Sequence, residues 1–461
     1  MAKQTINELR DFPAIEELLQ DPALETAVRS IPRPQATEII REVVSDFKAQ
    51  FQKSPKPLSL EDLRDAITQA ILVTGREEMI RVINATGIIV HTNLGRAPLP
   101  AKILASVIPA VTGYSNVEFD LGTGQRGSRG RACEGRLANL SGAESATVVN
   151  NCAAALFIIL NTLASRKRVI ISRGELVQIG GGFRIPDILK RAGAKLCEVG
   201  TTNITTLSDY ESAIDSNTAL ILKVHKSNFV QAGFTEEVTL RDLVTLGRKS
   251  NIPVVNDLGS GVFVETKELL GYSEPTVQQS VRAGAYLTCF SGDKLLGGTQ
   301  AGLIVGDKLL VQKIKKNPLF RAVRVDKIVF AMLEQLLASY MKGSHIDEVP
   351  IWHMLSTPAS ELYQSGKQIL KELGSPDGVS VEATKAYVGG GALPESDIPS
   401  VAIVFAPAIS AEKLLAAFRR LDPPIIGRIA DDRFLLDLKA IDKSDYPYLV
   451  SSISTIISSF K

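Results

Sequence analysis

Apolar residues recur at steps of three and four through the first part of the chain. Two such series are present: Ile39, Ile40, Val43, Val44, Phe47 and Phe51, and then Leu60, Leu63, Ile67 and Ile71. This spacing places each series on one face of a helix. Pro55 and Pro57 separate the two series, because proline disfavours a continuous helix. Residues 1–80 are therefore expected to form a small helical domain and a connecting helix.

From Val82 onward, short β-branched runs alternate with longer helical patterns. The runs SATVVN, RVIIS, TALILKVH and IPVVND are predicted strands, and CAAALFIILNTLA, IPDILKRAGA and LRDLVTLGRKS are predicted helices. Strands separated by helices indicate βαβ units and a mostly parallel sheet with helices on its faces. The sequence thus predicts an α/β domain over residues 81–344, near the end of which stands the apolar helix pattern KIVFAMLEQLLASYM.

Residues 345–461 mix both patterns. VAIVFAP is a predicted strand, AEKLLAAFRRL is a predicted helix, and further strand and helix patterns follow. A segment of this size suits a smaller α+β domain.

Composition narrows the class of protein only in part. The 461 residues are 45% hydrophobic and 22% charged, with a formal net charge of +2, which is ordinary for a globular protein and silent about nucleic acid. Cys133, Cys152, Cys197 and Cys289 lack C-x-x-C spacing, so neither a metal site nor a disulfide framework is predicted. No run approaches the roughly 18 apolar residues of a membrane span, and no signal-peptide pattern is present. We therefore expect a cytoplasmic protein without a membrane partner.

The stretch VVNNCAAAL, residues 148–156, joins a predicted strand to a predicted helix. The strand ends at Asn150 and Asn151, and the helix starts at once. Free backbone N–H groups at a helix N-terminus suit a phosphate, and the small residues Cys152, Ala153 and Ala154 would let it approach the backbone. A routine strand-to-helix turn is the alternative interpretation.

A second predicted strand ends in an acid, Asp257 of IPVVNDLGSG. Ligands of open α/β sheets bind beyond the carboxyl ends of the strands, so Asp257 would face the same crevice as Asn150. Its carboxylate could hold a protonated ring nitrogen, or it could cap the loop that follows.

The third stretch is FSGDKLLGG, in which Lys294 follows an apolar run and Ser291 stands three residues earlier. A lysine that acts as a nucleophilic amine needs desolvation or nearby positive charge. Gly297 and Gly298 would permit close approach to a ligand, although a solvated turn lysine is possible. The order of phosphate turn, acid and lysine is the plan of the aspartate-aminotransferase-like fold, in which pyridoxal 5′-phosphate is bound covalently to the lysine and serves as an electron sink.

Five longer motifs carry a family resemblance. They are INATGIIVHTNLGRAPL (83–99), SRGELVQIGGGFRIPDI (172–188), KVHKSNF (223–229), FSGDKLLGGTQAG (290–302) and LFRAVRVDK (319–327). Together with LRDFPAIEELL near the N-terminus, they resemble the bacterial selenocysteine synthases, the L-seryl-tRNA(Sec) selenium transferases. The resemblance implies a fold type I, pyridoxal-phosphate-dependent transferase that forms a homodecamer, a pentamer of dimers with active sites at the dimer interfaces.

The resemblance also implies a reaction. Seryl-tRNA(Sec) would lose water to give aminoacrylyl-tRNA, with Lys294 removing the Cα proton, and selenium from selenophosphate would then be added. Arg96, Arg321 and Arg324 match the family's anion-binding arginines, whose planar guanidinium groups suit phosphate-like oxygens. Asp293 matches a further active-site residue.

Other placements stay open at this stage. His225 and Asn228 could face the cofactor ring or its 3′-oxygen, and Glu175 or Gln178 could lie over the ring. A core or loop role is an alternative for each of them, and His91 is equally ambiguous.

By resemblance, the N-terminal domain would grip the tRNA. Residues 1–50, however, contain six Lys and Arg but nine Asp and Glu, whereas phosphate contact normally requires a basic surface. Either Arg29, Arg33 and Lys48 cluster on one face, or recognition depends on tRNA shape and on basic residues elsewhere, such as KIKK at 313–316.

Two other functions compete with this reading. One is a small-molecule lyase of the same fold that acts on a free amino acid or amino sugar. The other is a catalytically silent tRNA-binding scaffold, which would have no need of Lys294, Asp257 and the phosphate turn together.

Overall fold

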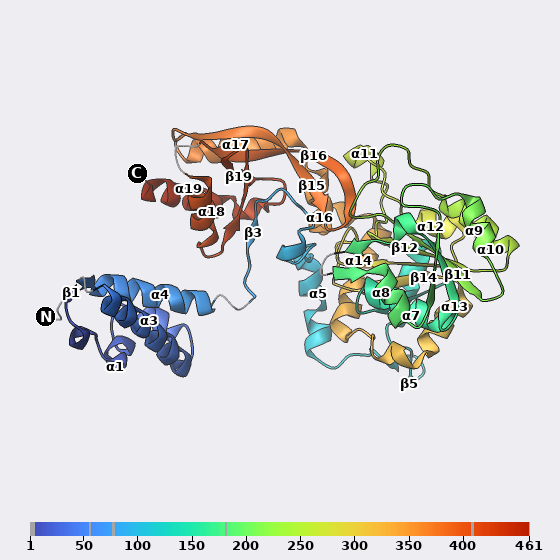
Figure 1. Ribbon diagram of the computed structural model, residues 1–461, viewed down its shortest axis with the longest axis horizontal. Coiled ribbons are helices and arrows are strands. Elements are labelled where there is room, and N and C mark those ends of the chain that lie inside the picture. Colours follow the sequence, from blue (N-terminus) through green and yellow to red (C-terminus); the bar gives the residue numbers. More distant parts are fainter. Residues whose placement is uncertain (1–4, 55–56, 76–78, 180–181, 407–409, 461) are drawn as a thin grey trace. The chain divides into compact units, whose positions relative to one another are not determined.

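The chain divides into two compact units, Met1–Val82 and Ile83–Lys461. The computed structural model describes residues 5–54, 57–75, 79–179, 182–406 and 410–460 (Figure 1). Pro55, Pro407 and the pair Gly180 and Gly181, which belong to motifs quoted above, lie outside the described residues.

The first unit is helical, as its apolar spacing predicts. Its elements are β1 (Thr5–Ile6), α1 (Ile15–Leu19), α2 (Glu25–Arg29), α3 (Arg33–Lys53), β2 (Leu58–Ser59) and α4 (Leu60–Gly75). The two apolar series lie on α3 and α4, where Ile40, Leu63, Ile67 and Ile71 are fully buried. These side chains belong to a core confined to this unit.

A seven-stranded sheet forms the centre of the second unit. Its strands, in spatial order, are β10 (Lys195–Val199), β7 (Arg168–Ser172), β11 (Thr218–Val224), β12 (Val254–Gly259), β13 (Leu287–Ser291), β14 (Gly302–Gly306) and β6 (Ser145–Val149). All neighbours are parallel except at β14, which is antiparallel to both β13 and β6. The predicted mostly parallel α/β sheet is therefore confirmed.

Both faces of this sheet are buried. Val148, Leu303 and Phe290 pack into one core, whereas Val149 and Ile304 belong to the core on the opposite face, because successive side chains of a strand point to opposite sides. The helices of this region are α5 (Ala101–Thr112), α6 (Arg131–Ser141), α7 (Cys152–Ala164), α8 (Ile185–Arg191), α9 (Leu207–Ala213), α10 (Leu240–Lys249), α11 (Lys267–Leu270), α12 (Val277–Ala283), α13 (Lys308–Lys316), α14 (Lys327–Lys342), α15 (His345–Glu348) and α16 (Pro350–Ser356). Two short hairpins, β4 (Phe119–Asp120) with β5 (Gln125–Arg126) and β8 (Gln178–Ile179) with β9 (Phe183–Arg184), complete it.

The C-terminal part of the second unit has an antiparallel sheet of its own, in the order β15-β16-β19-β18. Its elements are α17 (Ala359–Glu372), β15 (Val379–Gly389), β16 (Ala392–Phe405), α18 (Ala411–Arg419), β17 (Ile425–Ile426), β18 (Arg428–Ala430), β19 (Arg433–Asp437) and α19 (Tyr446–Ser459). The long pair β15 and β16 is clear in Figure 1. Strand β3 (Ile83–Asn84) pairs with β17, which ties the start of the unit to this region. The separate domains expected for residues 81–344 and 345–461 stay a prediction.

Among the described residues, no helix is both long enough and apolar enough to cross a membrane.

Candidate active site

A cavity of about 250 Å³ lies where β6, β12 and β13 end. The strands are parallel, so their carboxyl ends meet at one edge of the sheet. The cavity collects nine of the predicted residues: Arg96, Asn151, Cys152, Ala153, His225, Asp257, Ser291, Asp293 and Lys294. The three separate sequence stretches thus converge on one place.

Lys294 is buried in this cavity, with only 5% of its surface exposed. The backbone N–H of Leu295 donates to Ser260, and that of Gly297 donates to the Lys294 carbonyl, so the turn is fixed on both sides of the lysine. The solvated turn lysine considered above is therefore wrong. A desolvated amine of this kind is the form that lysine takes in nucleophilic catalysis.

The N-terminus of α7 opens onto the same cavity. Asn151 is its N-cap, and its side-chain oxygen accepts a hydrogen bond from the Ala154 N–H at 2.8 Å. Cys152 and Ala153 line the cavity. Asn150 is exposed and donates its N–H to Val323, and it is absent from the described lining. A phosphate could therefore meet the first turn of α7 through Asn151, Cys152 and Ala153.

Asp257 is buried on the floor of the cavity, with 8% exposure. Burial raises the pKa of its carboxyl group, and a buried carboxylate is costly unless a cation faces it. The Cys152 Sγ lies 3.4 Å from its Oδ1, and Cys289 stands beside it in register on β13. The Sγ atoms of Cys152 and Cys289 and a carboxylate oxygen of Asp257 lie within 4.8 Å of one another. The spacing of the cysteines in the sequence did not predict that these two would lie so close together.

Arg96 and Asp293 form an ion pair at the rim. The Arg96 Nη1 donates to the Asp293 Oδ2 at 2.8 Å, and the Ala97 N–H donates to the Asp293 carbonyl. Asp293 is buried, whereas about a third of the Arg96 side chain is exposed. Arg96 also has a φ of +65°, an uncommon conformation for a residue with a side chain. The guanidinium group is therefore held in one place by a fixed turn and a fixed carboxylate.

His225 lines the cavity beside Asp257, whose carbonyl accepts its backbone N–H at 2.9 Å. Its Nε2 lies 3.2 Å from the Oε1 of Glu274, a buried carboxylate. Asn228 instead donates its side chain to the Gln178 carbonyl and is exposed, and it is not part of the described lining.

Glu175 and Gln178 do not line this cavity in the described part of the chain. Glu175 is buried, accepting from Lys223 Nζ at 2.7 Å and from the Val224 N–H at 2.8 Å. The Gln178 side chain accepts from Arg184. Glu175 thus anchors the end of β11, and the placement of either residue over a ring gains no support.

Arg321 and Arg324 lie in a different cavity, of about 470 Å³. Arg324 Nη1 is 3.6 Å from Glu118 Oε1, a carboxylate that also pairs with Arg126 and Arg129. Within one chain, the structure does not bring these arginines to Arg96.

The glycines that approach Lys294 are not the predicted ones. A Cβ on Gly297 would lie 2.3 Å from Val349, and one on Gly298 would lie 2.6 Å from Leu336, so these glycines admit neighbouring side chains rather than a ligand. A Cβ on Gly391 would instead lie 3.4 Å from Lys294 Nζ. Gly391 follows Gly389 and Gly390 at the end of β15, and the run of three glycines was the signal that could have drawn attention to it.

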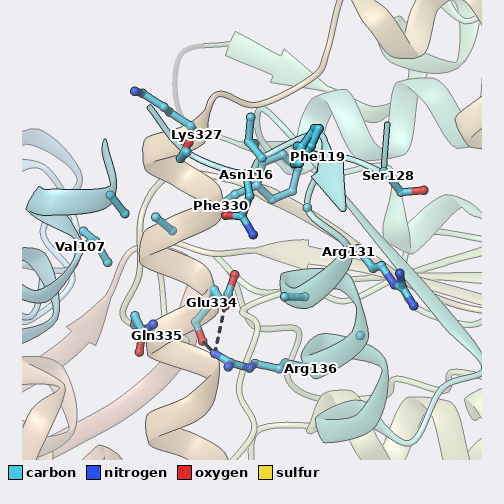
Figure 2. A pocket seen from close by; sticks show the side chains of 18 of the residues that line it. Val107, Asn116, Phe119, Ser128, Arg131, Arg136, Lys327, Phe330, Glu334 and Gln335 are labelled. Carbon is cyan, nitrogen blue, oxygen red and sulfur yellow. Dashed lines mark hydrogen bonds and ion pairs between the residues drawn. The ribbon is translucent and has the colours of Figure 1, made fainter. Parts of the chain in front are cut away.

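A further cavity, of about 720 Å³, holds none of the predicted cofactor residues (Figure 2). It lies among α5, α6, α14 and the segment around Phe119. In Figure 2 the Arg136 and Glu334 side chains meet on one wall, with Nη1 and Oε1 3.6 Å apart, and Phe330 lies nearby.

The three basic residues of the first unit that the sequence singled out are engaged within that unit. Arg29 pairs with Glu25 and Arg33 with Glu16, while Lys48 Nζ lies 5.5 Å from the centre of the Phe12 ring. In the second unit, Lys315 of the KIKK segment pairs with Glu134. None of these contacts identifies a tRNA-binding surface.

Comparison with known proteins decides the family. The family model described as L-seryl-tRNA selenium transferase matches residues 82–442, and a model of the N-terminal region of selenocysteine synthase matches residues 9–46. The chain belongs to the L-seryl-tRNA selenium transferase family. It is 42% identical over 457 residues to the L-seryl-tRNA(Sec) selenium transferase of Geotalea uraniireducens, covering 97% of this chain and 99% of that protein. Identity to the Aquifex aeolicus protein of the same name is 42% over 454 residues, covering 98% and 99%.

Among solved structures, the chain resembles a D-glucosaminate-6-phosphate ammonia-lyase, with a TM-score of 0.61 and 18% identity over 84% of this chain and 98% of that one. At this identity the likeness shows the fold alone. The predicted fold type I architecture and the family resemblance are both confirmed.

Proposed function

We propose that the Lys294 cavity is the site at which this selenium transferase converts the seryl group of seryl-tRNA(Sec) to selenocysteinyl-tRNA(Sec). The observation that carries the proposal is the burial of Lys294 in one cavity with Asp257 and the α7 N-terminus, in a chain that matches the family over nearly its whole length.

The residues present fit pyridoxal 5′-phosphate. Asp257 would face its protonated ring nitrogen, which would neutralise the buried carboxylate, and Asn151, Cys152 and Ala153 would bind its phosphate through the start of α7. When bound, the cofactor supplies an electron sink for the electrons of the Cα–H bond. Ser291 and His225 would complete the wall around it.

Lys294 would hold the cofactor and would then take the Cα proton of the seryl group. That proton would leave with the β-hydroxyl as water, which gives aminoacrylyl-tRNA. The selenium of selenophosphate would then add to the β-carbon, the α-carbon would regain a proton, and water would cleave the Se–P bond to release phosphate. Burial of Lys294 serves the first step because it keeps bulk water away from the amine that must accept the proton. Asp293 would keep Arg96 turned toward the incoming donor.

We further propose that the donor, selenophosphate, meets Arg96 together with Arg321 and Arg324 of a second copy. Arginine forks suit its oxygens, and the separation of the two arginine sets within one chain is explained if sites form between copies. A homodecamer built from dimers is the assembly proposed. Exposed apolar side chains that line the cavity of Figure 2 support a contact between copies; they are Phe119, Leu121 and Met341. A cytoplasmic location belongs to the same proposal.

The test is a direct assay of substrate. The purified protein is incubated with pyridoxal 5′-phosphate, selenophosphate and either seryl-tRNA(Sec) or free serine, and the aminoacyl product is identified. We expect selenocysteinyl-tRNA(Sec) from the first mixture and no turnover in the second. Turnover of free serine alone would favour the small-molecule lyase and overturn the proposal. A Lys294→Ala protein that kept the absorbance band of the lysine-bound cofactor would overturn the role of Lys294.

A further inference from the structure

A second cavity of the same unit, of about 690 Å³, has no role in the site described above. It lies between the segment 86–91, strand β15, helix α18 and the strands β17 and β18. Its walls include Ile88, His91, Tyr387, Leu415, Arg419 and Arg428.

Two segments connect this cavity to the Lys294 cavity. The first is the turn from His91 to Arg96, in which the Arg96 N–H donates to the His91 carbonyl at 2.9 Å, so that His91 lines one cavity and Arg96 the other. The second is the end of β15. Tyr387 lies four residues before Gly391, which approaches Lys294 Nζ, and four extended residues span at most about 13 Å. A group joined to a substrate at Lys294 is therefore within reach of this cavity.

The chemistry of the walls suits a flat, partly apolar group with a polar edge. Ile88 and Leu415 are apolar, and Tyr387 has 45% of its surface exposed. The His91 Nδ1 is buried and has no hydrogen-bond partner among the described residues. Burial lowers the pKa of His91, which favours the neutral ring, and a neutral imidazole has one donor and one acceptor nitrogen.

The two arginines of the cavity differ in availability. Arg428 is committed to the fold, since it donates to the Thr86 carbonyl and the Thr384 hydroxyl and pairs with Asp437 at 3.1 Å. Arg419, at the end of α18, has no ion-pair partner in the described part of the chain. It can face an anion at the mouth of the cavity.

We propose that this cavity binds the terminal adenosine of the aminoacylated tRNA. The base would stack on Tyr387 and offer its edge to His91, Arg419 would face the adjoining phosphate, and the ester-linked serine would extend to Lys294. Stacking of an unpaired base on an aromatic ring, with a cation on the backbone, is the usual way in which proteins hold single-stranded ends. The inference rests on the proposed function, since it assigns a place to the nucleotide that carries the serine.

The first test uses tRNA(Sec) whose terminal adenine is replaced by 2-aminopurine, a base whose fluorescence falls on stacking. We expect quenching when the tRNA binds the holoenzyme, and loss of that quenching in Tyr387→Ala. With ordinary seryl-tRNA(Sec), the KM of this variant should rise about tenfold, the size typical of a lost stacking contact, with kcat nearly unchanged. Tyr363→Ala is the matched control, because Tyr363 is 38% exposed on α17 and does not line the cavity.

The second test removes the proposed phosphate contact. Arg419→Gln should raise the KM for seryl-tRNA(Sec) and reduce the slope of log affinity against log salt by about one. Lys371→Gln, on α17, is its control and should leave both quantities unchanged.

The outcomes separate this proposal from the function on which it rests. Absence of any turnover by the wild-type protein would contradict the proposed function itself. Normal turnover without quenching, or with Tyr387→Ala and Arg419→Gln indistinguishable from their controls, would overturn the adenosine site alone. If Tyr387→Ala sedimented as a smaller species than the wild-type protein, the walls of this cavity would be a contact with a second copy of the chain. That result would also overturn the adenosine site.

Discussion

The ion pair between Arg96 and Asp293 fixes the position of a cation beside Lys294. Asp293 is buried, and its Oδ2 receives the Arg96 guanidinium at 2.8 Å. Hydrogen bonds between charged groups contribute about 1.5–3 kcal/mol. If Arg96 receives the anionic donor as proposed, this ion pair fixes the position of its guanidinium group.

Asp293→Asn should lower kcat/KM for the selenium donor about tenfold, because the amide cannot hold the guanidinium as a charge partner. The absorbance of the lysine-bound cofactor should stay unchanged. The measurement is steady-state kinetics with varied selenophosphate, accompanied by the absorption spectrum. Loss of the cofactor band would instead show that Asp293 supports the lysine, and Glu268→Gln on α11 serves as a surface control.

For single residues, the sequence predicted which side chains would line the site better than it predicted which residues would pack against them. Lys294, Asp257 and the turn at Asn151 could be recognised because each lies near the carboxyl end of a strand, and strand ends of a parallel sheet share an edge. The approach of Gly391 to Lys294 could not be foreseen, since it joins positions almost a hundred residues apart through the antiparallel pair of β15 and β16. The distance of Arg321 and Arg324 from Arg96 likewise depends on tertiary packing.

Helix α7 and strand β14 meet backbone to backbone. A Cβ added to Gly302, the first residue of β14, would lie 2.0 Å from the Asn151 carbonyl oxygen and 3.0 Å from the Cys152 nitrogen. Both contacts are to main-chain atoms, which cannot turn aside as a side chain can. This glycine therefore fixes the height of the α7 N-terminus above the sheet.

Gly302→Ala should lower the free energy of unfolding by about 1–3 kcal/mol, the usual cost of overpacking a filled interior. It should also weaken cofactor binding if the first turn of α7 binds the cofactor phosphate as proposed, because that turn must move. Chemical denaturation and a cofactor titration measure the two effects. Gly113→Ala is the control, since its Cβ would make only an ordinary contact of 3.5 Å, and equal behaviour of the two variants would contradict the argument.

Lys439, which follows β19, provides a pH-dependent prediction. It is 3% exposed, donates to the Thr357 carbonyl at 2.6 Å, and burial lowers its pKa from 10.5 to about 8. Between these two values the unfolded chain holds a proton that the folded chain lacks, so stability rises with pH across this window. Below pH 8 both states are protonated, and the folded state carries the full cost of the buried charge.

Relative to Lys439→Met, the wild-type free energy of unfolding should therefore rise by about 3 kcal/mol between pH 8 and pH 10.5. Urea denaturation of both proteins at several pH values measures the difference. If the free energy of unfolding changed with pH equally in the two proteins, the pKa of Lys439 would not be lowered in the folded state, and the prediction would be contradicted. The lost hydrogen bonds of the variant add only a constant offset.

Where strand and helix patterns alternate, the sequence predicted the first and last residues of the strands and helices closely. RVIIS is β7 and CAAALFIILNTLA is α7, residue for residue. The direction of β14 could not be predicted in the same way, because GLIVG is as apolar as the parallel strands of the sheet. Its direction follows from the connection at residues 292–301, which contains no helix. A parallel strand would need a crossover connection, usually a helix, to return the chain to the opposite edge of the sheet.

The two units of the whole molecule have separate cores. The first unit packs around Ile40, Leu63 and Ile67, none of which belongs to a core of the second unit. Within it, Arg29 pairs with Glu25 and Arg33 pairs with Glu16. Sequence composition could not resolve this, since ion pairing depends on which side chains meet.

A chain that begins at Ile83 should keep the absorbance of the lysine-bound cofactor, because every residue of the Lys294 cavity lies in the second unit. If the first unit grips the tRNA, affinity for tRNA(Sec) should fall at least tenfold, measured by filter binding at fixed salt. Unchanged affinity would place recognition on the second unit. Arg29→Gln and Arg33→Gln in the full chain then test whether those two side chains contribute.

The run Gly389–Gly391 has one more consequence. All three residues have positive φ, and a Cβ on Gly389 or Gly390 would lie 2.4 Å from Ile88 or Val90. Gly391 itself therefore presents only main chain toward Lys294, so this position has no side chain that could be exchanged to admit a smaller or a differently charged substrate. Evolution or protein engineering that seeks a new substrate would have to work from the other walls, and the glycine run would be the last part of the site to change.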